Sequence, residues 1–271
     1  MSPIRQLSFA LILLAGTAAM QARAECAQAA AIVQHAYPNA TEGDNGHYEA
    51  GGYTLAVPGD GYNDSHTMIC KTWPAHPELT LAAVPLMQSS TDDENAGDLD
   101  VLVLDSASQK VQQRLRLKHF MDDDAIRIET IAFDTARYQL APGILAFGVR
   151  KTLEGSSHVN PFEEVDLSLY VIDNGKLRAV IDGVVVSKSN GEWDGNCAGT
   201  STDSKSVLSM SKDNSHGFAG IDIATTTQEA SSELDSQKQC QDKLGKSRRD
   251  QVHLSYDGQK YAMPKHLVPI S

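Results

Sequence analysis

The sequence is short of positive charge, of aromatic residues and of long apolar runs. It carries 23 Lys and Arg against 35 Asp and Glu, which gives a formal net charge of −12 over 271 residues. This balance argues against a nucleic-acid-binding protein and against a polybasic membrane-surface protein, because both need a basic surface. Beyond the N-terminal region, no apolar stretch approaches the roughly 20 residues that a transmembrane helix needs. Hydrophobic residues still make up 41%, enough for a packed core and too much for a disordered chain.

Common catalytic motifs are also missing. The chain has no HExxH, GxSxG, P-loop or GxGxxG pattern, the signatures of zinc proteases, α/β-hydrolases and nucleotide-binding enzymes. The nine histidines are scattered without the spacing of metal ligands. We therefore predict a protein that is not an enzyme. A pair of catalytic carboxylates far apart in the sequence is the alternative that this pattern leaves open.

Residues 1–24 predict a cleavable signal peptide. Arg5 supplies a positive n-region, residues 7–19 form an apolar h-region, and residues 22–24 are a small-x-small cleavage site. Cleavage would remove two arginines and leave 247 residues with a net charge of −14. Glu25 stands before Cys26, where a bacterial lipobox needs a small residue. We therefore predict a periplasmic or secreted protein that is soluble and is not a lipoprotein.

Four cysteines favour two disulfides in an oxidising compartment. Three connectivities are possible, and we predict Cys26–Cys70 and Cys197–Cys240, because each pair would join a local section of the chain. A zinc site is the alternative, but the sequence has no CxxC and no Cys-x-x-His cluster.

Strand patterns dominate from residue 53 onward, where period-2 alternation and β-branched residues prevail. The Ala-rich segment 26–36 is the best helix candidate. The strand patterns recur in the same order at nearly constant spacing, which is typical of an internal repeat. The three predicted units are 79–86, 98–105 and 110–117, then 144–151, 165–173 and 176–183, then 207–212, 220–227 and 251–258. We predict an all-β fold of repeated antiparallel meanders, either β-propeller-like or built of stacked sheets, with a short N-terminal helix and one domain over residues 25–271.

Turns and loops complete this prediction. Asn174-Gly175 predicts a tight hairpin turn, because both residues accept a positive φ. Two further strands are predicted at 126–133 and 184–190. Long polar stretches at 87–97, 154–164 and 228–250 are predicted as functional or mobile loops. The last of these stretches contains Cys240 and a basic patch of Lys243, Lys246, Arg248 and Arg249.

An acidic loop over residues 92–100, Asp-Asp-Glu-Asn-Ala-Gly-Asp-Leu-Asp, precedes an apolar strand. Oxygen ligands at its positions 1, 3 and 9, with glycine at position 6, favour Ca²⁺, which takes about six to eight oxygens. The loop resembles the calcium loop of FG-GAP (integrin-α-type) repeats, D-x-[DN]-x-D-G-x-x-D. The resemblance implies Asp92, Glu94 and Asp100 as ligands and Gly97 as the turn residue.

The acidic loop departs from that pattern at Ala96, where a ligand is expected, and Asp98 is an extra acid that can substitute. We therefore predict a bound Ca²⁺ held by Asp92, Glu94, Asp98 and Asp100. A solvated acidic turn is the alternative. His47 and His66, with Asp60 and Asp64, are a second metal candidate in a Gly-rich stretch.

Three segments carry a wider resemblance: CKTWPAHPELTLAAVPL (70–86), ARYQLAPGILAFGVR (136–150) and SHGFAGIDI (215–223). They are similar to segments of proteobacterial periplasmic β-proteins with Ca²⁺-binding, propeller-like folds. Some of those proteins are immunity proteins that block secreted cell-wall hydrolases, in bacteria that kill neighbours through a type IV secretion system. The resemblance implies a non-catalytic inhibitor of a lysozyme-like or chitinase-like effector.

An inhibitor of this kind needs a projecting loop whose polar or aromatic tip fills the cleft between the catalytic carboxylates of the hydrolase. The candidate loops are 156–162, 190–196 and 256–261. Their predicted binding residues are Ser157, His158, Asn160, Phe162, Trp193, Tyr256 and Tyr261. The last loop resembles the Ser-Gly-x-x-Tyr loop of bacterial lysozyme inhibitors, with Asp257 in place of serine. Aromatic residues that anchor a turn or pack across a hairpin are the alternative for all three.

The sequence therefore predicts a periplasmic inhibitor or immunity protein that binds and blocks a secreted peptidoglycan hydrolase. Its acidity favours a basic partner through electrostatic steering. The alternatives are a Ca²⁺-stabilised envelope- or carbohydrate-binding module and a hydrolase of unknown type. The aromatic content of 6% disfavours the carbohydrate-binding module, because sugar sites use aromatic platforms.

Overall fold

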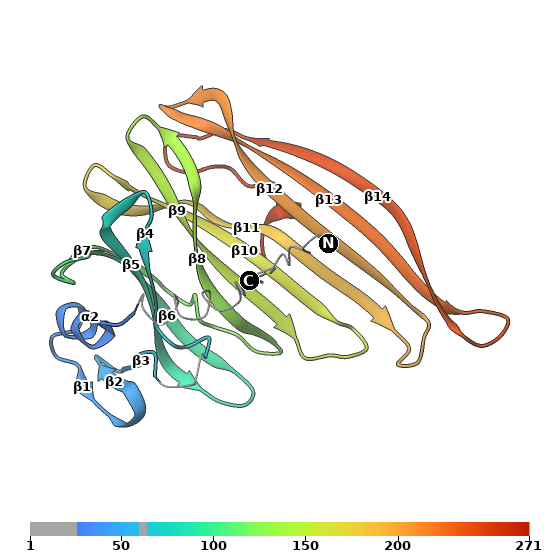
Figure 1. Ribbon diagram of the computed structural model, residues 1–271, viewed down its shortest axis with the longest axis horizontal. Helices are drawn as coiled ribbons and strands as arrows, with labels where there is room; N and C mark the ends of the chain where they lie inside the picture. Colours follow the sequence, from blue (N-terminus) through green and yellow to red (C-terminus); the bar gives the residue numbers. More distant parts are fainter. Residues whose placement is uncertain (1–25, 60–63, 271) are drawn as a thin grey trace, which may run out of the picture.

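The computed structural model describes residues 26–59 and 64–270, so the predicted signal peptide lies outside the described residues. The described chain is almost all β, with one α-helix, α2 (Ala29–Ala36), and two seven-stranded antiparallel sheets, named sheet A and sheet B here (Figure 1). The all-β prediction and the helix predicted within 26–36 are confirmed. Two short 3₁₀ helices, η1 (Asp44–Gly46) and η2 (Lys265–Leu267), complete the elements.

Sheet A contains the strands of the N-terminal part, in the order β1-β2-β3-β5-β6-β7, with β4 paired to β5. Its strands are β1 (Thr41–Glu42), β2 (His47–Ala50), β3 (Tyr53–Ala56), β4 (Ile69–Trp73), β5 (His76–Ser90), β6 (Asn95–Asp105) and β7 (Val111–Leu117).

Sheet B is a continuous meander in the order β14-β13-β12-β11-β10-β9-β8. Its strands are β8 (Ile126–Ala141), β9 (Ile144–Gly155), β10 (Phe162–Asp173), β11 (Lys176–Trp193), β12 (Gly199–Ser215), β13 (Phe218–Leu234) and β14 (Cys240–Leu254).

The three predicted strand groups each form an antiparallel meander. The first is β5–β6–β7 in sheet A, and the other two are β9–β10–β11 and β12–β13–β14 in sheet B. The predicted turn at Asn174 and Gly175 joins β10 to β11, and both residues have positive φ, 50° and 72°. The strand predicted separately at 184–190 is the continuation of β11, which runs through bulges.

The main core lies between the two sheets, as expected for stacked sheets. Leu99, Val101 and Val103 of β6 pack in one buried cluster with Phe147 of β9 and Tyr170 of β10. The alternate residues of β5 and β6 point to the other face of sheet A, where they meet the helix; these include Ala82, Val84, Leu102 and Leu104. Because β5 and β6 are buried on both faces, their sequences are nearly continuous apolar runs.

Helix α2 covers the outer face of sheet A with Ile32 and Val33, which are both 1% exposed. The disulfide Cys26–Cys70 ties the start of the helix to β4, and the second disulfide is Cys197–Cys240. Both predicted pairs are confirmed, and they indicate an oxidising, exported environment. Among the helices of the described segments, none combines the length and apolarity of a membrane span.

A second core lies within sheet B, where β11 separates from β12. These two strands pair only from Ser187 to Trp193 of β11. The C-terminal segment, residues 255–270, runs alongside the part of β11 that β12 leaves, and Tyr261 donates its backbone N–H to Val180 O at 2.9 Å. Leu267 of this segment is buried in the second core.

The polar run 228–250 is a strand pair, so its prediction as a loop was wrong. It lies in the hairpin of β13 and β14, whose tip in Figure 1 reaches beyond the other hairpins. Residues 240–251 are all exposed, and a strand that is exposed on both faces shows no apolar alternation. The other two predicted loops are also shorter than expected, because only 91–94 and 156–161 lie outside strands.

Candidate functional site

Three loops meet at one end of sheet B, which we call the loop end. They are residues 156–161 between β9 and β10, 194–198 between β11 and β12, and 235–239 between β13 and β14. They lie at the same end because the strands that carry them are antiparallel neighbours in register. The disulfide Cys197–Cys240 links the second loop to the start of β14.

The structure brings two of the three predicted binding loops together at this end. Gly191 donates its backbone N–H to Pro161 O at 3.1 Å, and Trp193 donates its N–H to Val159 O at 2.8 Å. Loop 156–161 therefore extends the pairing of β10 with β11. Within the loop, Ser157 Oγ accepts the N–H of Asn160 at 3.1 Å, which closes a compact turn.

The predicted binding residues of this region differ in exposure. Ser157, His158 and Asn160 are exposed. Phe162 is half-buried beneath the Lys188 ammonium, which lies 5.1 Å from the centre of the ring. Trp193 is 44% exposed. The polar tip and the indole are therefore accessible to a partner.

Exposed apolar side chains gather at the loop end as well. Val159 is 47%, Trp193 44% and Leu234 57% exposed, and each comes from a different pair of strands. Large apolar side chains in water mark interaction surfaces when they cluster. Trp193 is one of the predicted binding residues. Val159 and Leu234 are not, because a single apolar residue in a polar loop carries no periodic signal.

Several exposed acidic side chains lie on the β9, β10 and β11 strands of this end, whereas Lys238 lies in the third loop. Glu154 of β9 and Glu163 of β10 are exposed and stand directly opposite each other in the register. Like charges in this position destabilise a sheet. Glu192 and Asp194 follow on the adjacent strand end, and both are exposed. The loop end thus presents negative charge that a positively charged partner would relieve.

Asp194 is also the residue that shapes its loop. Its carboxylate accepts the backbone N–H groups of Asn196 and Cys197, both at 2.8 Å. These hydrogen bonds lower the pKa of Asp194 below its ordinary value, so the loop keeps its charge and its shape at neutral pH.

The predicted calcium ligands Asp98 and Asp100 lie on β6 and are buried, 7% and 0% exposed. Asp100 accepts Arg116 Nε at 2.5 Å and Arg116 Nη2 at 3.1 Å, and it also accepts the Tyr37 hydroxyl at 2.7 Å. Asp98 accepts the Tyr53 hydroxyl at 3.1 Å. The charge that the sequence assigned to a cation is therefore balanced by a guanidinium.

The contacts in this network also explain the shifted pKa values of Asp98 and Tyr37. Burial alone would raise the pKa of Asp98, but the backbone N–H of His119 and the side chains of Arg116 and Tyr53 hold it below its ordinary value. Burial, together with the charge of Asp100, raises the pKa of Tyr37. Asp98 thus remains ionised and paired with Arg116 near neutral pH.

The other two predicted calcium ligands, Asp92 and Glu94, lie in the turn 91–94. The guanidinium of Arg127 contacts Asp92 O and pairs with Asp123 at 2.9 Å. Among the described residues, no three or more His, Cys, Asp or Glu side chains are grouped as a metal site. The structure therefore does not assemble Asp92, Glu94, Asp98 and Asp100 into one ligand set.

The third predicted binding loop does not expose its aromatic residues. Tyr256 and Tyr261 are each 3% exposed and pack 5.3 Å apart between ring centres, with Phe218 stacked on Tyr256 at 4.5 Å. The Tyr261 hydroxyl donates to Ala219 O at 2.6 Å. As a binding tip this prediction is corrected, because both rings anchor the C-terminal segment to the second core.

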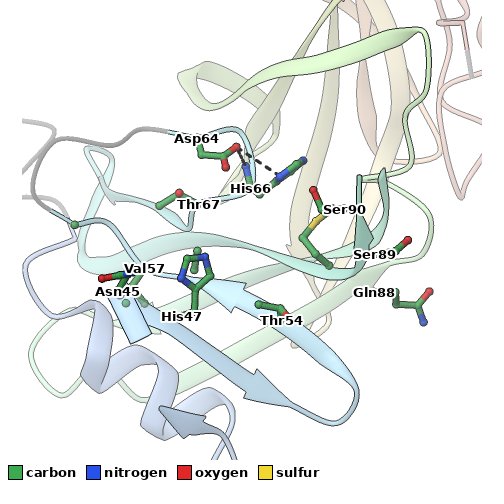
Figure 2. A pocket seen from close by; sticks show the side chains of 14 residues that line it. Asn45, His47, Thr54, Val57, Asp64, His66, Thr67, Gln88, Ser89 and Ser90 are labelled. Carbon is green, nitrogen blue, oxygen red and sulfur yellow. Dashed lines mark hydrogen bonds and ion pairs between the residues drawn. The ribbon is translucent and has the colours of Figure 1, made fainter. Parts of the chain in front are cut away.

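A pocket of about 650 Å³ lies beside β2, β3 and the end of β5. Figure 2 shows His66 and Asp64 on one side of it and His47 on the other. His66 Nδ1 lies 3.6 Å from Asp64 Oδ1, and its Nε2 is buried and has no hydrogen-bond partner among residues 26–59 and 64–270. The folded chain thus places His47, His66 and Asp64 on one pocket, as the second metal candidate requires, but does not group them as ligands. Asp60 lies outside the described residues.

Comparison of the chain with protein-family models, with curated proteins and with solved structures finds no match. The function of the protein is therefore inferred from the geometry of the surfaces and pockets above.

Proposed function

We propose that this protein is a non-catalytic binding protein of the periplasm, and that it blocks a basic peptidoglycan hydrolase with its loop end. One observation carries the proposal: backbone hydrogen bonds join loop 156–161 to the end of β11 at Trp193, and exposed acidic residues lie nearby. The two disulfides support an exported location, because such bonds persist in oxidising compartments.

The loop end has the composition of a protein-binding surface. Tryptophan is among the residues that most often dominate binding energy, when it is surrounded by contacts that exclude water. Val159 offers apolar contact area beside Trp193, Leu234 adds an exposed apolar residue on the β13–β14 hairpin, and Ser157 and Asn160 offer hydrogen-bonding groups. Backbone pairing and the Cys197–Cys240 disulfide hold these groups in place before binding, which lowers the entropy lost on association.

Charge supports a basic partner in particular. The chain carries 35 acidic against 23 basic residues, and Glu154, Glu163, Glu192 and Asp194 place part of that excess at the loop end. Complementary charge accelerates association and discriminates against acidic proteins. Hydrolases of peptidoglycan act with carboxylates in an open cleft, into which the tip formed by Ser157, His158 and Asn160 would project.

The test is binding and inhibition with two basic hydrolases, a lysozyme-type and a chitinase-type enzyme. Association is measured by biolayer interferometry, and inhibition by the turbidity of a cell-wall suspension. We expect Trp193→Ala to weaken binding at least tenfold, or about 1.4 kcal/mol, because it removes the central apolar contact. Val207→Ala is the matched control, since Val207 is an equally accessible apolar residue, 68% exposed, on β12 outside the loop end.

The charge component has its own pair of variants. Glu163→Gln should slow association and reduce its dependence on salt, whereas Glu42→Gln, at an exposed position on β1 of sheet A, should leave both unchanged. The proposal is wrong if neither hydrolase binds, or if Trp193→Ala and Val207→Ala have equal effects. Binding to purified peptidoglycan in the absence of any hydrolase would instead support an envelope-binding module.

A further inference from the structure

Strand β10 places polar side chains on the face of sheet B that packs toward sheet A. Glu164, Asp166 and Ser168 alternate with apolar residues along the strand and are 0%, 4% and 5% exposed. Tyr170 continues the same face into the main core. A row of buried polar groups in a core strand is costly unless each group finds a partner.

Glu164 has its partners. Its Oε2 accepts the Lys188 ammonium at 2.7 Å, and its Oε1 accepts the backbone N–H of Ile270 at 2.9 Å. Asp166 has none: neither of its carboxylate oxygens has a hydrogen-bond partner among the described residues. Lys151, on the adjacent strand opposite Asp166, places its ammonium over the Phe120 ring, 5.0 Å from the ring centre.

The side chain of Asp166 lines a cavity of about 230 Å³. Phe120, Val149, Pro269 and Ile270 supply most of its apolar wall. Pro269 is seated against Gly183, where a Cβ would lie 2.8 Å from the proline Cγ, so the C-terminal segment closes one side. Asp182 and Val268 also line the cavity and are exposed, which marks the opening to solvent.

We propose that this cavity, the Asp166 pocket, binds a small primary alkylammonium ion whose ammonium group pairs with Asp166. The buried carboxylate provides acceptors for N–H donors, with the Ser168 hydroxyl beside it, and the apolar wall accommodates the methylene groups. A divalent metal ion fits less well, because it needs several oxygen or nitrogen ligands and the described residues contain no group of three such side chains. An anion fits less well, because two carboxylates, Asp166 and Asp182, line the pocket against one ammonium group, that of Lys151.

Protons compete with the ligand for Asp166. Burial, and then the charge of Glu164, raise the pKa of Asp166 to about 7, against the opposing charges of Lys151 and Lys188. Asp182 on β11 and Lys151 on β9 are the other titratable groups that line the pocket, whereas Phe120 and the lining residues of the C-terminal segment contribute none. Because the ligand pairs with the ionised carboxylate, affinity should fall by about tenfold per pH unit below the pKa.

The experiment titrates the protein with n-butylammonium chloride in phosphate buffer, followed by NMR and calorimetry. We expect saturable 1:1 binding at pH 8, about tenfold weaker binding at pH 6 than at pH 8, and a loss of at least tenfold in Asp166→Asn. Asparagine keeps the shape of the side chain and removes its charge, so this variant should fold. Glu129→Gln is the control for a lost surface charge and should bind as the unmodified chain does.

Neutral n-butanol distinguishes charge recognition from simple filling of an apolar cavity. The proposal is overturned if n-butanol binds as tightly as n-butylammonium, if Asp166→Asn retains full affinity, or if no saturable binding occurs, in which case the pocket is merely hydrated. These outcomes do not depend on any hydrolase, so they test the Asp166 pocket separately from the loop end.

Discussion

The buried, unpaired carboxylate of Asp166 makes a stability prediction whose size follows from the structure. The pKa of this group rises from an ordinary 3.8 to about 7 in the folded protein. Between these two pH values the folded state holds a proton that the unfolded state has released. Stability therefore decreases as the pH rises through this window and levels off above about pH 7.

The magnitude follows from about 1.4 kcal/mol per pKa unit. Relative to low pH, the titration of Asp166 lowers the stability of the folded state by about 4 kcal/mol at pH 8, and by about 2 kcal/mol at pH 5, where only the unfolded state is ionised. Asp166→Asn removes the titration. We therefore expect the stability of the variant, relative to the unmodified protein, to increase by about 2–3 kcal/mol between pH 5 and pH 8.

Urea unfolding at both pH values, followed by circular dichroism, measures this difference. Phosphate and acetate buffers are needed, because Tris is itself a primary amine and could occupy the Asp166 pocket. Glu129→Gln serves as the surface control and should show no such change between the two pH values. A stability difference for Asp166→Asn that is the same at pH 5 and pH 8 would show that Asp166 is not desolvated as the structure indicates.

Three further predictions concern the network and the loop end. Asp100→Ala should destabilise the protein by about 3–5 kcal/mol, because it leaves the Arg116 guanidinium without its main partner. A loss below about 1 kcal/mol in urea unfolding, which is the range of an exposed ion pair, would contradict this prediction. Replacing Cys197 and Cys240 by Ser should lower stability by up to about 4 kcal/mol, since their bond closes a loop of sequence separation 43, and unchanged thermal unfolding would refute that. EDTA and Ca²⁺ should leave the melting temperature unchanged, because Arg116 already balances the buried acids; a rise with Ca²⁺ that is lost in Asp92→Ala would restore the calcium prediction.

Much of the fold could be predicted from local patterns. The alternation of apolar and polar residues identified the strands of the meanders. In a strand, side chains that face the core are apolar, and the side chains next to them in sequence point to the opposite face of the sheet. The hairpin at Asn174 and Gly175 was predictable because its backbone geometry restricts the residue type. The β13–β14 hairpin was missed for the opposite reason: its residues are largely exposed to water, and the few apolar residues of the stretch 228–250, among them Leu234 and Leu244, do not alternate with a period of two.

The candidate site was only partly predictable. Trp193 and loop 156–161 were identified as separate tips, but their adjacency depends on the register of β10 against β11, which no local pattern encodes. Tyr256 and Tyr261 look like any exposed aromatic turn, and it is the C-terminal segment folding over the second core that buries them. Val159 and Leu234 become noticeable only when the three loops meet.

The sequence by itself determined the strand content, the negative charge and the two disulfide pairs of this protein, because each depends on residue type and on short distances along the chain. The tertiary structure decided where the charges act. It pairs Asp100 with Arg116, which lies 16 positions away on the neighbouring strand, and it leaves Asp166 alone in a pocket closed by residues about a hundred positions later. A carboxylate is paired, solvated or buried without a partner according to the groups that folding brings within a few ångströms of it. The order of residues along the chain does not reveal which groups these are.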